Sequence, residues 1–439
     1  TLGNLHLYWA CELGKNLSLL LQDRTEYSKK YNRDALYHPD TLSLPSQLDA
    51  LLAITDVRNS YESDYRKFRN VPTVSLKWRK YMPGAYSKRE YLAWDFIFSS
   101  VISSERLSYM RNNTTQDKKR TSYEFIPSFN FKILPTKKPG EQLIFNLTYQ
   151  QGIASMYDLL DYVDDAMPQV VKLGNPRLKG TVSTTLSIQF TDWESKHKGQ
   201  SYHLRGNFNY YHRQVAQSVV FNPDNSQYTY QPKNVSGAYY ASAQFDFTRF
   251  LDKRQRWSWQ TTLNADYNHS VDHVLQAGMT ESSPNAVNTL TLHDGLWFQY
   301  QHQDLSLRAT GDIRWRHSEG KMRDFTTLNA YDYQYGLAAR YTLPVLKTTL
   351  SVDGNMYRRR GYGSKTLNTD DFVLNASISQ PFLKGKLIAN IEAFDLLHQL
   401  SSTQYAINAQ GRTETWNRSL PNYIMFHVVY HFTPVRDKK

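Results

Sequence analysis

The sequence has a single cysteine, Cys11, and no long apolar run. One cysteine excludes an internal disulfide framework, although it does not fix the compartment. No stretch approaches the roughly 18 consecutive apolar residues of a transmembrane helix. The mean hydropathy of −0.62 is likewise too polar for a helical membrane protein. The sequence begins at Thr1 and includes no signal peptide.

Signatures of catalysis and of nucleic-acid binding are also missing. No Ser-His-Asp order or paired carboxylates stand in a context that supports catalysis, so we expect no enzyme and no cofactor. Arg358–Arg360, Gly361 and Gly363 lack the spacing of a phosphate-binding loop. The net charge of +12 suits a nucleic-acid partner. No RNA-binding or helix-turn-helix pattern accompanies it, so we expect basic residues in turns, at strand ends and on an inward face instead.

The sequence instead shows alternation with a period of two, from about Thr181 to Phe432. One face of one segment carries Leu305, Leu307, Ala309, Ile313 and Trp315, and the other carries Ser306, Arg308, Thr310, Asp312, Arg314 and Arg316. This period predicts β-strands with unlike surroundings on their two faces. The 32 tyrosines and 9 tryptophans suit aromatic girdles at two membrane interfaces. We therefore predict an all-β fold, an antiparallel transmembrane β-barrel over residues 1–439.

Short and long connections alternate along the chain, as do the periplasmic turns and extracellular loops of outer-membrane barrels. Residues 33–70 are predicted to be a long extracellular loop, and residues 151–176 an extracellular loop with a short helical stretch. We count about seventeen strands, whereas bacterial single-chain barrels have even numbers and plugged transporters have 22. We therefore expect a piece of a 22-stranded barrel that lacks its N-terminal strands and plug. Because a barrel must be exported, the missing signal peptide also leads us to expect a piece that lacks its natural N-terminus.

The alternation also predicts which side chains face lipid and which face the lumen, because a charged residue on the lipid face is costly. The residues expected to point outward are Ile188, Phe190, Leu263, Leu307, Ile313, Leu374, Ile378, Phe426 and Val428. Those expected to point inward are Gln189, Asn264, Asp312, Arg314, Asn375 and His427.

Two stretches carry more specific motifs. Between Leu147 and Phe190, a strand ends in Tyr149, Leu159 and Leu160 follow, and Gly174-Asn175-Pro176 with Leu178 opens the next strand. Near the C-terminus, Asn390–Leu397 ends in Asp-Leu-Leu, and Leu420-Pro421-Asn422-Tyr423 precedes the last strand. These stretches resemble the barrel of TonB-dependent receptors, particularly the outer-membrane β-barrel family common in Bacteroidota.

This resemblance implies active import of a scarce nutrient (a siderophore, glycan or peptide) across the bacterial outer membrane. It implies an N-terminal plug that is absent from this sequence, and the TonB-ExbB-ExbD complex acting through that missing part. Lipopolysaccharide, outer-membrane lipid and the barrel assembly machinery are the other expected partners. A plugless structural or adhesive barrel without active transport is the competing function, and an outer-membrane phospholipase or protease is a third.

Loop aromatic and acidic residues are the candidate ligand-binding residues, because aromatic faces stack on sugars and catechols. They are Tyr157, Tyr162, Asp161, Asp164, Asp165, Tyr228 and Tyr230. Packing within loops or at the membrane interface is the competing interpretation of the tyrosines, and solvated carboxylates that of the aspartates. No metal site is expected, because His427 and His431 would lie about 13 Å apart on a strand.

Overall fold

The computed structural model describes the chain apart from residues 1, 38–49, 51–52, 82–89, 135–140, 168, 194–198, 276–277, 322–324, 364–367, 400–402, 409–410, 417–421 and 433–439. Its strands are β1 (Leu2–Glu12), β2 (Leu17–Asp34), β3 (Tyr61–Tyr81), β4 (Glu90–Arg111), β5 (Thr114–Ile133), β6 (Glu141–Gln151), β7 (Val163–Met167), β8 (Val170–Leu173), β9 (Val182–Trp193), β10 (Gln200–Asn222), β11 (Gln227–Val235), β12 (Tyr239–Phe250), β13 (Trp257–Val274), β14 (Ser283–His302), β15 (Leu305–Gly320), β16 (Leu328–Thr342), β17 (Thr349–Arg360), β18 (Asp370–Phe382), β19 (Leu387–Phe394), β20 (Thr403–Asn408), β21 (Gly411–Trp416) and β22 (Tyr423–Tyr430). A short 3-10 turn, η2 (Leu383–Gly385), links β18 to β19. In the part of the chain that is described, no helix is long and apolar enough to cross a membrane.

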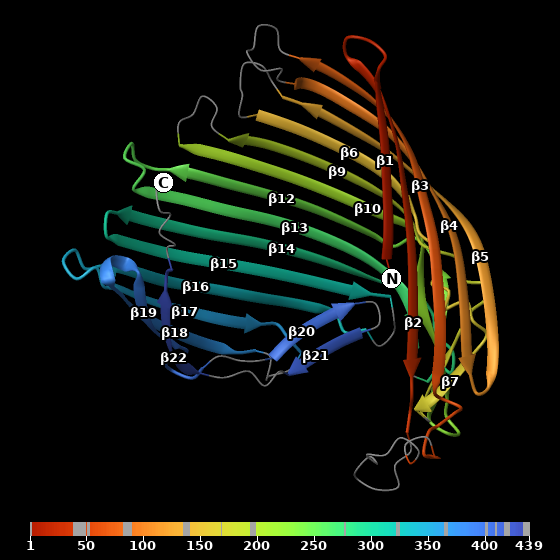
Figure 1. The fold of residues 1–439 in the computed structure, drawn as a ribbon. Helices are drawn as coiled ribbons and strands as arrows, with labels where there is room; N and C mark the ends of the chain where they lie inside the picture. The colour runs from red at the N-terminus through yellow and green to blue at the C-terminus, as the bar shows by residue number, and fades with distance from the viewer. Residues whose placement is uncertain are drawn as a thin grey trace.

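One curved wall makes up most of the molecule (Figure 1). The main sheet has 20 strands. Three of them, β7, β8 and β11, form a branch at one end. The remaining seventeen pair in the order β1, β2, β3, β4, β5, β6, β9, β10, β12, β13, β14, β15, β16, β17, β18, β19 and β22, every pair antiparallel. The antiparallel all-β fold and the predicted number of strands are thereby confirmed.

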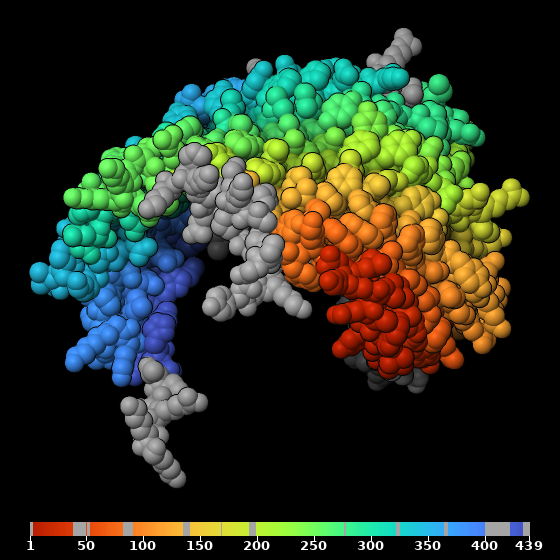
Figure 2. Space-filling model, turned by 90° about the horizontal axis from the view of Figure 1, so that it is seen from above, coloured from red at the N-terminus to blue at the C-terminus, as the bar shows by residue number. Residues whose placement is uncertain are grey.

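The wall is open along one side. Seen from above, the described strands trace a C whose two ends are the first and the last strands (Figure 2). Among the described residues, no pairing joins β1 to β22. Because the wall has an odd number of antiparallel strands, β1 and β22 run in the same direction, so these two strands cannot pair antiparallel with each other.

The registers divide the wall into one apolar face and one polar face. Residues opposite each other on paired strands point to the same side. Ile313 is opposite Tyr333, whereas its neighbour Arg314 is opposite His293, which is itself opposite Asn264. The same relationship holds across the wall, so all residues predicted to point outward share the apolar face and all those predicted to point inward share the polar face. Ile313 and Phe426 remain 47% and 65% exposed, as side chains that meet lipid should.

Asp294 is an exception on the apolar face. It is opposite Leu263 and Ile313, and its Oδ1 accepts a hydrogen bond from the Thr261 hydroxyl at 3.1 Å. Strict alternation would place an apolar residue at this position. The hydrogen bond partly compensates for placing a carboxylate on the apolar face.

One predicted loop boundary and one predicted helical stretch are wrong. β3 already begins at Tyr61, so Tyr61–Asn70 belongs to the wall and not to the predicted loop 33–70. Both faces of this stretch are polar, which hides the period of two from sequence inspection. In the connection between β6 and β9 (residues 152–181), residues 156–160 form turns and a bend rather than a helix, and β7 and β8 follow.

Connections at the two ends of the wall differ, as predicted. One end has short connections such as residues 303–304 between β14 and β15. The other, which we call the long-loop end, carries residues 35–60, 152–181 and 395–422. A tight turn at Asn112–Asn113, with φ of 48° and 53°, is an exception at this end, because β4 ends at Arg111 and β5 already starts at Thr114.

Candidate functional site

The β6–β9 connection lies against the polar face of β2–β5 at the long-loop end. Its Met156 and Leu160 pack on Leu107 and Tyr109 of β4, and all four are buried. Leu107 and Leu160 are 0% exposed. Tyrosines surround this cluster from both sides, namely Tyr61, Tyr65, Tyr157 and Tyr162. An apolar contact of this kind holds a long connection in one position against the wall.

Tyr157 is bound to the wall by its hydroxyl as well as by its ring. Its Oη accepts a hydrogen bond from Asn32 Nδ2 at 3.3 Å and lies 3.1 Å from the Ser63 hydroxyl. Its ring meets Tyr109 edge-on, with centroids 6.4 Å apart. The predicted ligand contact through Tyr157 therefore competes with a structural role that this residue already has.

The first turn of the connection is held through Arg120 of β5. Its Nη2 donates to the Ala154 carbonyl at 2.8 Å, and its Nε donates to the Glu105 carboxylate at 3.0 Å. Lys67 Nζ lies 3.4 Å from the same carboxylate, and Tyr65 also donates to it. Glu105 is buried, so these donors supply the compensation that a buried carboxylate requires.

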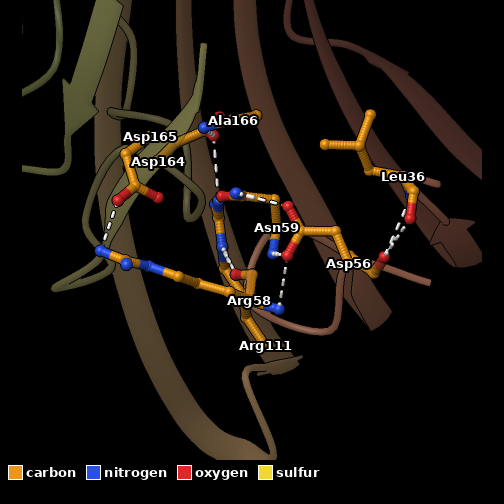
Figure 3. Close-up of polar contacts among 9 residues, drawn as sticks. Leu36, Asp56, Arg58, Asn59, Arg111, Asp164, Asp165 and Ala166 are labelled. Atoms are coloured by element: carbon orange, nitrogen blue, oxygen red, sulfur yellow. Dashed lines mark hydrogen bonds and ion pairs between the residues drawn. The ribbon is translucent and has the colours of Figure 1, made fainter. Parts of the chain in front are cut away.

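Arg111, the last residue of β4, joins two connections (Figure 3). Its Nη2 donates to Asn59 Oδ1 at 2.5 Å and to Asp164 Oδ1 at 2.9 Å, and its Nε donates to the Arg58 carbonyl at 2.9 Å. Arg58 in turn forms an ion pair with Asp165. Arg58 and Asn59, which precede β3, and the β6–β9 connection are thus fastened to each other across the end of β4.

The pKa values of two aspartates in the β6–β9 connection shift in opposite directions. Burial acts to raise the pKa of Asp164, but hydrogen bonds from Arg111 and from the Ala166 amide outweigh it, so the pKa is lowered. Burial alone raises the pKa of Asp158. Asp161 is held through its backbone, because Gln116 Nε2 donates to its carbonyl at 2.6 Å. Burial therefore decides the pKa of Asp158, whereas hydrogen bonds decide that of Asp164.

The Gly174-Asn175-Pro176 motif closes the connection. A Cβ atom on Gly174 would lie 1.8 Å from the Leu160 carbonyl oxygen, so only glycine fits there. Asn175 donates its amide hydrogen to the Asp158 carbonyl at 2.6 Å and its side-chain amide to the Pro232 carbonyl at 2.8 Å. The motif therefore fixes the β6–β9 connection to itself and to β11.

The two tyrosines predicted in a second loop lie in β11. This strand forms a hairpin with β10 and pairs parallel with β8, where Tyr228 is opposite Val170 and Tyr230 is opposite Lys172. Tyr228 also packs on Phe221, with ring centroids 4.7 Å apart. The structure thus brings both predicted loops together in one small sheet.

Two pockets open at the long-loop end. The larger, of about 390 Å³, is lined by Asp34, Leu36, Asn59, Tyr61, Tyr109, Arg111, Tyr157, Leu160, Tyr162, Asp164, Ala166 and Lys172. The smaller, of about 230 Å³, shares Asp34, Tyr61 and Arg111 with it and is also lined by Glu62, Met110 and Asn112. The larger volume lies within the range of about 300–1,000 Å³ that is usual for small-molecule sites.

Three of the seven predicted ligand-binding residues, Tyr157, Tyr162 and Asp164, line the larger pocket. Asp161, Asp165, Tyr228 and Tyr230 are not among its lining residues. Sequence reasoning missed Asp34, Tyr61 and Arg111, which stand at strand ends that border the long connections. Within the described ranges, no group of three or more His, Cys, Asp or Glu residues is arranged to hold a metal ion.

A large antiparallel wall with one apolar and one polar face is the architecture of an outer-membrane β-barrel protein. Residues 104–303 match the model of the outer membrane protein beta-barrel family. This match covers fewer than half of the 439 residues. Together with the two-faced antiparallel wall, it bears out the predicted outer-membrane β-barrel class and the location in the outer membrane.

Solved structures with a similar fold include a protein described as the copper transporter OprC, at 8% identity and a TM-score of 0.45 over 94% of this chain and 64% of that one. The chain therefore spans less than two thirds of the length of that transporter. A mutant of the ferric enterobactin receptor PfeA from Pseudomonas aeruginosa is similar at 8% identity and a TM-score of 0.32, over 97% of this chain and 77% of that one. Comparison with curated protein sequences finds no match.

Proposed function

We propose that the chain is the barrel part of a TonB-dependent receptor that imports a scarce nutrient across the outer membrane. The observation that carries the proposal is the pocket at the long-loop end. Strand ends and two separate connections line it together, as expected for a ligand site formed by the loops of a receptor. Loops at one rim of a barrel are the part that can vary without breaking the strand pairing, and they are where ligands of such proteins bind.

The motifs that resemble this class of receptor also form defined structures. Asp395, which begins the Asp-Leu-Leu turn after β19, is 0% exposed. Its amide donates to Asn375 Oδ1 at 3.0 Å, and its Oδ1 accepts from the Gln399 amide at 3.1 Å. Leu420 and Pro421 lie outside the described residues. A plug and the TonB-ExbB-ExbD complex are partners that this function requires, and lipopolysaccharide and the barrel assembly machinery are partners that its location suggests.

Deletion of Ser155 to Ala166 in the full-length receptor tests the proposal. We expect uptake of the native nutrient to be abolished in cells, while the amount of assembled protein in the outer membrane is unchanged. Replacing the short turn Leu383–Lys386 with Asn-Gly is the control, because it lies at the opposite end and should leave uptake unchanged. Normal uptake by the deletion variant would contradict the assignment of binding to this connection.

A further inference from the structure

Two opposite charges at the larger pocket lack an ion-pair partner among the described residues. The other two charged side chains that line it, Arg111 and Asp164, pair with each other at 2.9 Å. Asp34, the last residue of β2, and Lys172 of β8 both line the pocket. Among the described residues neither forms a salt bridge within 4 Å, although Lys172 stands opposite Asp164 across β7 and β8 and its charge helps to lower the pKa of that carboxyl. Both are exposed, so both are accessible to a ligand.

The rest of the lining includes four tyrosines, and the charges of the pocket balance. Tyr61 and Tyr109 stack with ring centroids 5.3 Å apart, and Tyr162 lies 6.2 Å from Tyr109. The charged lining residues are two acids, Asp34 and Asp164, and two bases, Arg111 and Lys172. A pocket with balanced charge favours a ligand without net charge, and opposite unpaired charges favour one that carries both signs.

We propose that this pocket binds a short peptide with free ends. Its ammonium group would lie at Asp34 and its carboxylate at Lys172, while its side chains pack on Tyr61, Tyr109 and Tyr162. A neutral glycan offers no charged group to Asp34 or Lys172, and a strongly anionic ligand would meet the two carboxylates of a balanced pocket. The proposal rests on the receptor function proposed above and names the class of its ligand.

Binding of peptides to the purified full-length receptor tests this inference. The probe is an equimolar library of tripeptides with free ends, and the capped library with acetylated N-termini and amidated C-termini serves as the comparison. Retention of peptides after rapid filtration, measured by mass spectrometry, should be at least about tenfold greater for the free-ended library, as expected when each end loses one charged contact.

Two variants separate the two ends. Libraries capped at one end only report the two ends separately. Lys172→Gln should lose the preference for a free carboxylate over an amidated C-terminus but keep the preference for a free amine over an acetylated N-terminus, and Asp34→Asn should do the reverse. Asp117→Asn and Lys119→Gln are matched controls on β5, since neither residue lines the larger or the smaller pocket, and both should bind like the wild type. No retention of free-ended peptides, equal retention of capped peptides, or unchanged preferences in the two variants would each overturn the proposal.

The outcomes also separate this inference from the proposed function. If the peptides do not bind but uptake of another nutrient depends on Ser155–Ala166, only the peptide inference fails. If no uptake depends on that segment, the proposed function fails whatever the peptides do.

Discussion

Arg111 at the end of β4 donates a hydrogen bond to Asp164 of β7 at 2.9 Å, and these two residues fasten a long connection to the wall. The Arg111 side chain is only 9% exposed. The same guanidinium holds Asn59 and the Arg58 carbonyl, so one side chain determines how two connections lie beside the pocket.

Replacing Arg111 with Gln should loosen the β6–β9 connection without unfolding the wall. Hydrogen bonds to charged groups contribute about 1.5–3 kcal/mol, and the partial exposure of Asp164 reduces this to about 1–2 kcal/mol. Faster amide hydrogen exchange over Ala154–Met167, with unchanged exchange in β13–β16, would show this. Lys119→Gln is the control, and equal exchange in both variants would contradict the role of Arg111.

Acid should release the same connection. Because the pKa of Asp164 is lowered in the folded state, its contribution to docking is fully present above the unfolded value of about 3.9. It is lost as the pH falls through the lowered pKa. Proteolysis of the connection should therefore stay slow at pH 5 and above and accelerate well below about pH 4, and the Asp164→Asn variant should lack this acid step.

Asp158 should behave in the opposite sense. Burial raises its pKa, so the folded state binds the proton more tightly, and docking weakens as the pH rises from the unfolded value through the raised one. Asp158→Asn should therefore strengthen docking at neutral pH by up to about 1 kcal/mol. Slower hydrogen exchange near residue 158 at pH 7 is the expected result, and faster exchange would contradict the assignment.

Glycine is required at two positions in this connection. A Cβ on Gly174 would lie 1.8 Å from the Leu160 carbonyl oxygen, and one on Gly180 would lie 1.7 Å from that of Gly152. Alanine at either position should cost about 1–3 kcal/mol and lower the yield of correctly docked receptor. Gly14→Ala is the matched control, because a Cβ there meets nothing within 4 Å. Equal protease resistance of all three variants would refute this packing.

The two faces of the wall can be tested on β15. Arginine in place of Ile313 would face lipid and should cost about 2–4 kcal/mol near mid-membrane, so assembly into the outer membrane should fall sharply. Thr310→Arg, three residues away on the polar face, should assemble nearly normally. Assembly is measured as the protease-protected barrel in outer-membrane fractions. If the register were wrong, Thr310→Arg would assemble poorly and Ile313→Arg nearly normally.

The wall could be predicted from sequence because each strand carries its own information. The alternation from Leu305 to Arg316 assigns each residue to a face before any partner strand is known, and the observed registers agree. The start of β3 was missed because Tyr61–Asn70 is polar on both faces. The prediction of a short helix near Leu159 was wrong, because residues 156–160 form turns and a bend. The Leu160 carbonyl lies directly against Gly174, a contact between residues 14 positions apart that the local sequence does not reveal.

The site could be predicted only in part. The tyrosines and aspartates of residues 151–176 signal a functional loop, but their partners are distant in sequence. Asn32 donates to Tyr157 from 125 residues away, and Arg111 reaches Asp164 across 53 residues. Nothing in a single sequence indicates such contacts, so Asp34 and Arg111 could be assigned to the pocket only from the structure.

Energised uptake is the measurement that tests the central claim most directly. Cells with and without the full-length gene would be given an isotope-labelled mixture of peptides, glycans and siderophores, with and without an uncoupler of the proton-motive force. We predict that accumulation of at least one compound class requires both the gene and the proton-motive force. Accumulation that never depends on the gene, or that depends on the gene but persists with the uncoupler, would contradict the account.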